Sequence, residues 1–403
     1  MDSKLLLSIS DKYECPLYIY DANKISSQYQ RFKYALKDVK RSRINYAVKA
    51  LSNISVLKLL KDLGSNLDCV SIQEVRLGLK AGFKPQEISF TPSGVSLEEI
   101  EEAALLGVKI NIDNLTMLEE FGSKNPKIPV SIRINPNIMA GGNKKISVGH
   151  KKSKFGIPTY QIDQVKEIES KTGMHINGVH MHTGSDILDI SVFLMGAEVL
   201  FNVAKQFRNL DFIDFGGGFK VAYKENEPAT NIEEFGKLIS KKFNDFCANY
   251  GKELELVFEP GKFLVSESGY FLAKVNVIKK IKDVTFAGID SGFNHLIRPM
   301  YYDAYHHIIN ISNPNAKEKK YNIVGYICET DTFAEDRMIS EIRQNDVLCF
   351  KNAGAYAFTM SSNYNSRLRP AEVLIYNDKD YLIRKRETFD DLLRNQTEIK
   401  IDL

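Results

Sequence analysis

A lysine, a run of glycines and a glutamate, each directly after a short apolar segment, are the residues of this sequence best suited to chemistry. Lys49 closely follows the apolar segment 44–48, where a buried ammonium group is costly unless it meets a partner. An imine between Lys49 and an aldehyde cofactor removes this cost, because an imine need not carry a free charge. The position of Lys49 therefore predicts a Schiff-base lysine.

The glycine run is Gly216, Gly217 and Gly218, which follows the apolar segment FIDF. Consecutive glycines let backbone N–H groups approach an anion closely, and such loops, which often open a helix, cradle phosphates. A tight turn that needs positive φ is the alternative explanation of the same glycines. Their position after an apolar segment favours phosphate binding.

Glu259 lies in the segment FEPGK and supplies a carboxylate. A carboxylate beside a ring nitrogen keeps that nitrogen protonated, which makes a pyridine ring a strong electron sink. His182, in HMHTGS, is a candidate aromatic neighbour of such a ring. His180 and His182 share a strand face and could bind a metal, but we expect none, since no third histidine or suitably spaced acidic pair is nearby. Lysine, glycine loop and carboxylate together predict pyridoxal 5′-phosphate (PLP).

These residues belong to a series of eight strand-like segments separated by helix-like segments, several of which end in glycine as a helix C-cap would. Eight strands with intervening helices predict an α/β fold, a (β/α)8 barrel of the TIM type, rather than an open sheet. The segments are INYAVKA (44–50), LDCVS (67–71), ISFTP (88–92), KINID (109–113), SIRINP (131–136), GVHMHTG (178–184), FIDFGGG (212–218) and LVFEPG (256–261).

The active site of such a barrel lies at the carboxyl ends of the strands, often with a phosphate site after strand seven. Polar side chains gather at these ends, and their agreement in position is a stronger signal than any one of them. They are Lys49, Ser71, Asp113, Asn135, His182, Gly216 to Gly218 and Glu259.

After residue 265 strand-like runs follow one another with few long helices between them, which predicts an antiparallel β-domain, a sandwich or a barrel. The early segment PLYIYD is also strand-like and is expected to pair with this domain. We therefore predict a PLP-binding barrel over residues 22–265 and a β-domain formed by residues 1–21 and 266–403.

The composition is that of an ordinary globular protein, with 43% hydrophobic and 26% charged residues. A net charge of +3 does not indicate nucleic-acid binding, and no apolar stretch reaches the ~20 residues of a membrane span. The N-terminal segment MDSKLLLSISDKY does not resemble a signal peptide. The five cysteines are scattered and include no CxxC pair, which is typical of a reducing cytoplasm. We expect a cytoplasmic protein that binds neither nucleic acid nor membrane.

Ten motifs occur along nearly the whole chain in an order that is highly specific. They are YAVKA, DCVS, RINPN, SKFG, HMHTGS, FGGGF, EPGK, DSGFNHLIRPMYYDAYH, CET and NAGAY. With them the sequence resembles the fold-type III PLP-dependent decarboxylases, similar to alanine racemase in fold, and most closely the diaminopimelate decarboxylase family. The resemblance implies a carboxy-lyase that converts meso-2,6-diaminopimelate to L-lysine and CO2, the last step of lysine biosynthesis.

The resemblance also implies roles for residues that bind the cofactor. Lys49 holds PLP, His182 stacks on its ring, and Glu259 pairs with the pyridine nitrogen. The further cofactor-binding residues that it implies are Ser185, Gly216, Gly217, Gly218, Gly261, Lys262 and Tyr356.

For the substrate, the resemblance implies that Arg298 and Tyr302 hold the distal carboxylate and that Glu329 contacts the distal amino group. Lys262 and Tyr356 are further substrate contacts. Cys328 resembles the proton donor, although a free cysteine in a strand is more commonly a small hydrophobic residue. In this family the cysteine and the glutamate come from the partner subunit, so a homodimer with shared active sites is implied.

One departure from the family pattern concerns Lys262, which stands where the family usually has arginine. Arginine holds an oxyanion with two N–H groups, whereas lysine is a compact point charge. The alternatives are an ornithine or arginine decarboxylase, a carboxynorspermidine decarboxylase and an alanine racemase. Glu329 together with Arg298 disfavours an ornithine or arginine decarboxylase. Glu329 also disfavours a carboxynorspermidine decarboxylase, and Glu259 disfavours an alanine racemase. A non-catalytic PLP-binding barrel would lack the motifs of residues 298–356, and a metal-dependent barrel hydrolase would not bind PLP.

Overall fold

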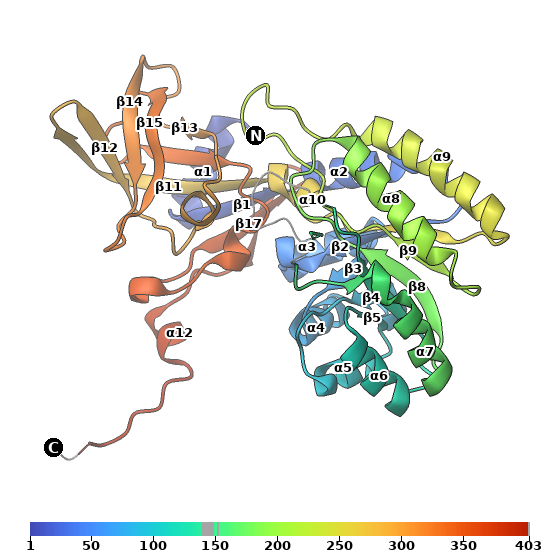
Figure 1. The fold of residues 1–403 in the computed structure, drawn as a ribbon. Coiled ribbons are helices and arrows are strands. Elements are labelled where there is room, and N and C mark those ends of the chain that lie inside the picture. Colours follow the sequence, from blue (N-terminus) through green and yellow to red (C-terminus); the bar gives the residue numbers. More distant parts are fainter. Residues whose placement is uncertain (139–148, 151–152, 402–403) are drawn as a thin grey trace. The chain divides into compact units, whose positions relative to one another are not determined.

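A computed structural model describes residues 1–138, 149–150 and 153–401 of the chain (Figure 1). These residues form two compact units. The barrel unit comprises residues 25–222 and 226–265, and the β unit comprises residues 1–24, 223–225 and 266–403.

Among the described residues, eight parallel strands of the barrel unit close into a ring. They are β2 (Ser42–Ala47), β3 (Asn66–Cys69), β4 (Ile88–Phe90), β5 (Lys109–Ile112), β6 (Val130–Asn135), β8 (Ile176–Met181), β9 (Phe212–Asp214) and β10 (Glu255–Phe258). Pairing of Phe258 on β10 with Ile44 on β2 completes the ring, and β7 (Ile157–Pro158) pairs with the end of β6. The predicted (β/α)8 barrel is confirmed.

The helices around these strands cover the outside of the ring (Figure 1). They are α2 (Ala22–Ala35), α3 (Ile54–Asp62), α4 (Ile72–Lys80), α5 (Leu97–Leu105), α6 (Leu115–Lys124), α7 (Ile162–Thr172), α8 (Ile190–Ala204) and α9 (Ile232–Tyr250). Polar caps begin several of them, as where the Ser96 hydroxyl accepts the N–H of Glu99. Gly173 and Gly251 end α7 and α9 in the left-handed conformation that glycine adopts readily.

A cluster of phenylalanines anchors the chain beyond the glycine loop. Phe219 directly follows Gly218, and its ring centroid lies 4.8 Å from that of Phe193 on α8 and 5.0 Å from that of Phe32 on α2. Burial of one such ring stabilises the fold by about 2 kcal/mol. The loop after β9 is therefore held at its far end by the hydrophobic core.

The β unit is built on a mixed sheet. Its strands are β1 (Leu17–Asp21), β11 (Gly269–Ile281), β12 (Val284–Ile289), β13 (Ile308–Asn310), β14 (Glu318–Val324), β15 (Thr332–Ser340), β16 (Val347–Lys351), β17 (Ala371–Tyr376) and β18 (Lys379–Arg384). Antiparallel pairs predominate, but β1 pairs with β17 and β12 with β14 in parallel. The early strand β1 also pairs with β11, so the segment PLYIYD joins this sheet.

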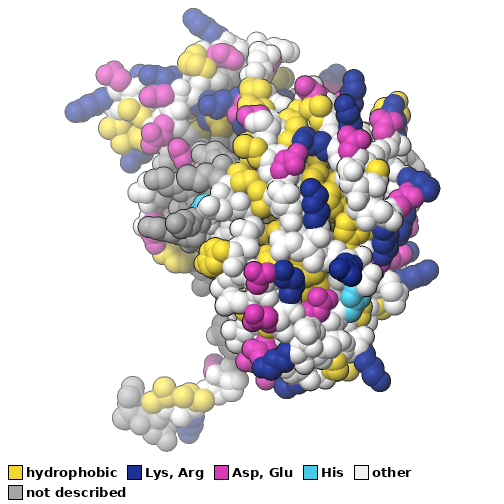
Figure 2. Space-filling view, turned by 45° about the vertical axis from the view of Figure 1, so that its right-hand side comes forward, with side chains coloured by type: hydrophobic (Ala, Val, Ile, Leu, Met, Phe, Trp, Pro, Cys, Tyr) yellow, Lys and Arg dark blue, Asp and Glu magenta, His cyan; other side chains and the backbone are white. Residues whose placement is uncertain are grey.

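Short helices complete the two units. In the β unit these are α1 (Ser3–Tyr13), α11 (Arg298–Tyr302) and α12 (Phe389–Leu393), and in the barrel unit α10 (Lys262–Val265) follows β10. Leu6 and Ile9 of α1 pack against Leu17 and Leu272 of the sheet. Of the described helices, not one is long and apolar enough to cross a membrane. On the face drawn in Figure 2, Lys and Arg side chains are interspersed with Asp and Glu, so neither sign of charge dominates it.

Candidate active site

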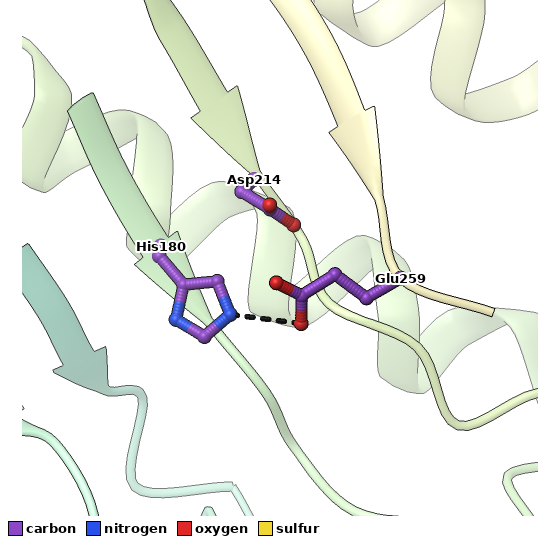
Figure 3. A group of neighbouring side chains, drawn as sticks. All are labelled: His180, Asp214 and Glu259. Atoms are coloured by element: carbon purple, nitrogen blue, oxygen red, sulfur yellow. Dashed lines mark hydrogen bonds and ion pairs between the residues drawn. The ribbon is translucent and has the colours of Figure 1, made fainter. Parts of the chain in front are cut away.

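Three buried side chains from neighbouring strands meet at the carboxyl end of the barrel (Figure 3). His180 lies on β8, Asp214 ends β9, and Glu259 directly follows β10. His180 Nε2 is 3.0 Å from Glu259 Oε2, and one ligand atom from each of the three residues lies within 4.8 Å of the others. This spacing could also hold a cation, so the sequence argument against a nearby acidic pair was wrong: β9 and β10 bring the two carboxyl groups together.

Burial dominates the protonation of this cluster. It raises the pKa of Glu259 to about 8 and the pKa of Asp214 well above its ordinary value, because a carboxylate is poorly solvated there. It also lowers the pKa of His180 to about 4, so its imidazole is neutral at pH 7. Glu259 Oε1 and His180 Nδ1 form no hydrogen bond among the described residues. Glu259 thus offers Oε2 to His180, whereas Oε1 has no hydrogen bond by geometry within the described part of the chain and lies in the same cluster as the Asp214 carboxyl group, which opposes part of the rise in the pKa of Glu259.

Two cations and a third acid surround the cluster. Asp68 on β3 further raises the pKa of Glu259, whereas Lys49 and Arg133 oppose this effect. Arg133 on β6 is buried, and its guanidinium lies 4.8 Å from the centroid of the Phe155 ring in the SKFG motif. Neither Asp68 nor Arg133 was predicted from the sequence as a site residue, although a charged residue within an apolar strand segment is a usable signal.

The glycine loop uses two of its N–H groups within the barrel. Gly216 N–H donates to Asp214 Oδ1 at 2.9 Å, and Gly217 N–H donates to His182 Nδ1 at 3.1 Å. The loop does not open a helix, since α9 begins only at Ile232. Phosphate binding at this loop must therefore draw on donors other than these two groups.

Close backbone packing explains the glycines independently of any ligand. A Cβ on Gly217 would lie 2.3 Å from the carbonyl oxygen of Glu259, and one on Gly218 would lie 2.3 Å from that of Gly184. Gly216 and Gly218 also adopt positive φ, at +69° and +110°. The tight-turn explanation of these glycines therefore holds, and it leaves phosphate binding as a further role.

His182 extends from β8 into the loop that also carries Ser185. Burial and the nearby Lys49 lower the pKa of His182 well below its ordinary value, so the imidazole is neutral. Because its Nδ1 accepts from Gly217, its proton is on Nε2. The hydrogen bond fixes the ring orientation, as a stacking partner for a cofactor requires.

Lys49 differs from the expectation of a buried amine. β2 ends at Ala47, and Lys49 lies in the 3-10 helix η1 (Val48–Ala50), where its side chain is 39% exposed. Its Nζ is 3.4 Å from Oδ2 of the buried Asp68. The burial argument for a Schiff base was therefore wrong, since both solvent and a carboxylate reach this amine. The amine is nevertheless accessible at the end of β2.

Lys262 and Gly261 continue from Glu259. Lys262 begins α10, is buried, and donates from Nζ to Asp186 Oδ1 at 2.6 Å. A Cβ on Gly261 would lie 3.1 Å from the Cβ of Ala47, so this turn packs against the end of β2. Asp186 was not predicted from the sequence, in which its position directly after the motif HMHTGS is the only signal for it.

In the β unit, Arg298 is a buried cation at the start of α11. It is 5% exposed, its Nη2 donates to the Tyr223 hydroxyl at 3.2 Å, and its Nε has no hydrogen-bond partner. None of the described carboxylates forms an ion pair with it. The Tyr302 ring centroid lies 5.8 Å from its guanidinium carbon. This site can accept an anion.

Cys328 and Glu329 are exposed in the β unit. Asn365 Nδ2 donates to Cys328 Sγ at 3.1 Å, and the Tyr364 hydroxyl donates to Glu329. Neither Asn365 nor Tyr364 was predicted from the sequence; both are polar residues of the segment between β16 and β17. Tyr356, in the same segment, has a φ of +54°, an unusual conformation for a bulky residue that often marks a functional position.

The structure thus describes the predicted site in two sets of residues, one in each unit. In the barrel unit, the predicted residues lie in the segments that follow the neighbouring strands β2, β8, β9 and β10: Lys49, His182, Gly216 to Gly218, Glu259 and Lys262. In the β unit, Arg298 lies with Tyr302, and Cys328 with Glu329. Ser71 and Asn135 have local roles instead: the Ser71 hydroxyl caps α4, and Asn135 binds backbone groups of residues 137 and 150.

Comparison with known proteins finds close relatives over nearly the whole chain. The chain is 38% identical over 400 residues to a diaminopimelate decarboxylase of Methanothermobacter thermautotrophicus, covering 97% of this chain and 93% of that protein. It is 36% identical over 405 residues to one of Campylobacter jejuni, covering 97% of each. A crystal structure of diaminopimelate decarboxylase from Helicobacter pylori complexed with L-lysine superposes with a TM-score of 0.88 at 35% identity, covering 96% of this chain and 98% of that chain.

A family model described as the pyridoxal binding domain of pyridoxal-dependent decarboxylases matches residues 22–266. Together with the closed barrel, this match defines a PLP-dependent amino-acid decarboxylase. The relatives that match nearly the full length identify the family within this class. The chain belongs to the diaminopimelate decarboxylase family, and PLP is its cofactor.

Residues of the barrel unit fit this cofactor. Glu259 Oε1 is buried without a partner, as expected of an acceptor for a ring N–H. The closely packed glycine loop follows the neighbouring strand, and the amine of Lys49 is accessible at the end of β2. Of the three groups that could hold a cation, Glu259 therefore also suits the nitrogen of a pyridine ring.

Proposed function

We propose that this chain decarboxylates meso-diaminopimelate to L-lysine and CO2, the last step of lysine biosynthesis. The observation that carries the proposal is the similarity along nearly the whole chain to diaminopimelate decarboxylases, one of them solved with L-lysine, the product. Bound PLP supplies an electron sink for the carbanion that the loss of CO2 leaves at Cα. The chain itself must anchor the cofactor, protonate its ring nitrogen, bind the substrate and return a proton.

Lys49 is the proposed anchor, since an accessible amine is needed to attack an aldehyde carbon. Asp68, 3.4 Å away, is placed to hold the charge of this amine or to take its proton. We assign His182 to the face of the ring. Ser185, Gly216, Gly217, Gly218, Gly261, Lys262 and Tyr356 are the proposed surroundings of the phosphate.

Glu259 is proposed to bring the ring proton. Because burial raises its pKa to about 8, Glu259 carries a proton at neutral pH. Glu259 would hold the ring nitrogen of PLP and supply it with this proton, and the Nε2–H of His180 would then stabilise the Glu259 carboxylate by a hydrogen bond. Burial thereby keeps Glu259 protonated at neutral pH, so that it can protonate the ring nitrogen.

Arg298 is proposed to bind the distal carboxylate of the substrate. Its burial without an acidic partner supports this role, because a buried guanidinium favours an anion. Tyr302 is assigned to the same carboxylate, and Lys262 and Tyr356 are assigned as further substrate contacts. Glu329 is proposed to contact the distal amino group.

Cys328 is proposed to return the proton to Cα. Its exposure together with Glu329 supports a role at the active site of a second copy, and we therefore propose a homodimer with shared active sites. We further propose a cytoplasmic enzyme whose partners are its amino-acid substrate and its second subunit, rather than nucleic acid or membrane.

The test is CO2 release by the PLP-loaded protein from meso-diaminopimelate, compared with ornithine, arginine and lysine. We expect release from meso-diaminopimelate and the absorption band of PLP bound to a lysine, with loss of both in Lys49→Ala. Activity on ornithine or arginine alone would assign the chain to the other basic amino-acid decarboxylases. PLP binding without any CO2 release would point to a cofactor-binding protein.

A further inference from the structure

An ion pair between a buried lysine and a partly exposed aspartate joins the loop after β8 to the start of α10. Lys262 Nζ donates to Asp186 Oδ1 at 2.6 Å, and the two side chains are 7% and 23% exposed. Asp186 has a φ of +60°, in the left-handed region that residues other than glycine rarely adopt. The fold therefore accepts backbone strain at the residue whose carboxylate meets this lysine.

The two segments that carry this pair contact the glycine loop on two sides. From the loop after β8, Ile187 N–H donates to the carbonyl of Gly218 at 2.9 Å. On the other side, the segment that leads to α10 packs so closely on Gly217 that a Cβ there would lie 2.3 Å from the carbonyl oxygen of Glu259. The ion pair thus belongs to the same cluster of loops as the proposed phosphate site.

An acid in this place opposes the binding of an oxyanion, because like charges a few ångströms apart repel. A buried lysine nevertheless needs a negative partner when no ligand supplies one. We propose that Asp186 is an internal counter-ion that holds Lys262 in the cofactor-free protein, and that an incoming oxyanion takes this lysine over. Asp186 is then a positioning residue that lowers the affinity of the site for oxyanions.

This inference rests on the proposed function, in which Lys262 contacts the cofactor and the substrate. The oxyanion has two possible sources, the phosphate of PLP and a carboxylate of the substrate. Asp186→Asn tests both, since asparagine removes the charge, keeps the shape and tolerates positive φ. The matched control is Asp189→Asn, which removes an exposed charge from the same loop and keeps a residue able to cap α8.

The first arm measures the dissociation constant of PLP for the full-length apoenzyme, together with competition by inorganic phosphate. If the phosphate takes Lys262, Asp186→Asn binds both ligands more tightly, by about two- to fivefold, as expected for one charge in a partly exposed pair. The second arm measures KM for meso-diaminopimelate with the holoenzyme. If a substrate carboxylate takes Lys262, KM falls and the dissociation constant of PLP does not.

In either case the gain must disappear when Asp186→Asn is combined with Lys262→Gln, because the effect acts through that lysine. A gain that Asp189→Asn reproduces would reflect only the charge of the loop and would overturn the inference. So would unchanged or weakened binding in a folded Asp186→Asn protein, which would make the pair a structural link. If Asp186→Asn does not fold, Lys262→Gln decides alone: retained affinity for PLP and substrate excludes the exchange, and loss of either supports it. Failure of the wild-type protein to bind PLP would instead refute the proposed function.

Discussion

His180 Nε2 lies 3.0 Å from Glu259 Oε2, and both side chains are buried at the carboxyl end of the barrel. Nε2 of the neutral imidazole is hydrogen-bonded to one oxygen of the carboxyl group, whose other oxygen has no hydrogen bond among the described residues. The site proposed for the ring nitrogen is thus a hydrogen-bonded pair rather than a single carboxylate, and the protonation of this pair depends on pH in a defined way.

We expect the melting temperature of the apoenzyme to fall as the pH rises from 6.5 to 8. Glu259 stays protonated in the native protein up to about pH 8 but ionises near 4.5 when unfolded, so raising the pH through this window favours unfolding. The depressed pKa of His180, about 4 against 6.5, acts in the opposite direction but only below pH 6.5. Thermal melts of wild type and Glu259→Gln across pH 5 to 8.5 test this. A fall of equal size in Glu259→Gln would show that other groups cause it.

His180→Leu is expected to weaken PLP binding to the apoenzyme by about tenfold, because it removes a hydrogen bond to a charged carboxylate. His180→Gln keeps an N–H donor near the same place and should recover part of the affinity. The readouts are the dissociation constant of PLP and the pH dependence of the absorption band of bound PLP. If both variants lose affinity equally while the band keeps its pH profile, His180 only fills space.

Replacement of Arg298 should raise KM for meso-diaminopimelate more than it lowers kcat. A hydrogen bond to a charged group contributes about 1.5–3 kcal/mol, so Arg298→Ala should raise KM by about ten- to a hundredfold. Tyr223→Phe removes a neutral partner of the same guanidinium at 3.2 Å and should have a smaller effect. Steady-state kinetics test the order of the two effects. A change confined to kcat in Arg298→Ala would remove this residue from substrate binding.

Mixed dimers test whether Cys328 serves the partner subunit. Lys49→Ala and Cys328→Ala homodimers should each be nearly inactive. If the sites are shared, a random mixture should recover about one quarter of wild-type activity, since half of the dimers are mixed and each contains one intact site. Differently tagged subunits allow the mixed dimers to be purified. Inactive mixed dimers would place Lys49 and Cys328 of one site in the same chain.

Much of the barrel is predictable from the sequence because its strands are short apolar runs followed by polar residues. This rule selects Lys49, His182 and Glu259, and the structure places them just beyond β2, β8 and β10. Their partners were not predicted, because strand register decides them: β2 and β3 pair Ala47 with Asp68, and this brings Asp68 next to Lys49. The register between β2 and β3 cannot be predicted from any local sequence pattern.

The same rule also selected residues whose polar groups serve the backbone. The Ser71 hydroxyl caps the N-terminus of α4 by accepting the N–H of Glu74. The Asn135 side chain donates to the backbone carbonyl of His150 in the following loop. In the β unit, the parallel pairing of β1 with β17 joins segments some 350 residues apart, which strand propensity cannot indicate. Long-range pairing and local capping therefore account for most of what the sequence left open.

Asp214 contacts two parts of the candidate site, the glycine loop and the buried cluster around Glu259. Its Oδ1 accepts the N–H of Gly216 in the glycine loop, and its carboxyl group lies in the same buried cluster as Glu259. If the glycine loop holds the phosphate and Glu259 meets the ring nitrogen, as we propose, a substitution at Asp214 alters both contacts in one event. Under that proposal, Asp214 couples retention of the cofactor to electron withdrawal by its ring, so neither property can be changed alone at this position.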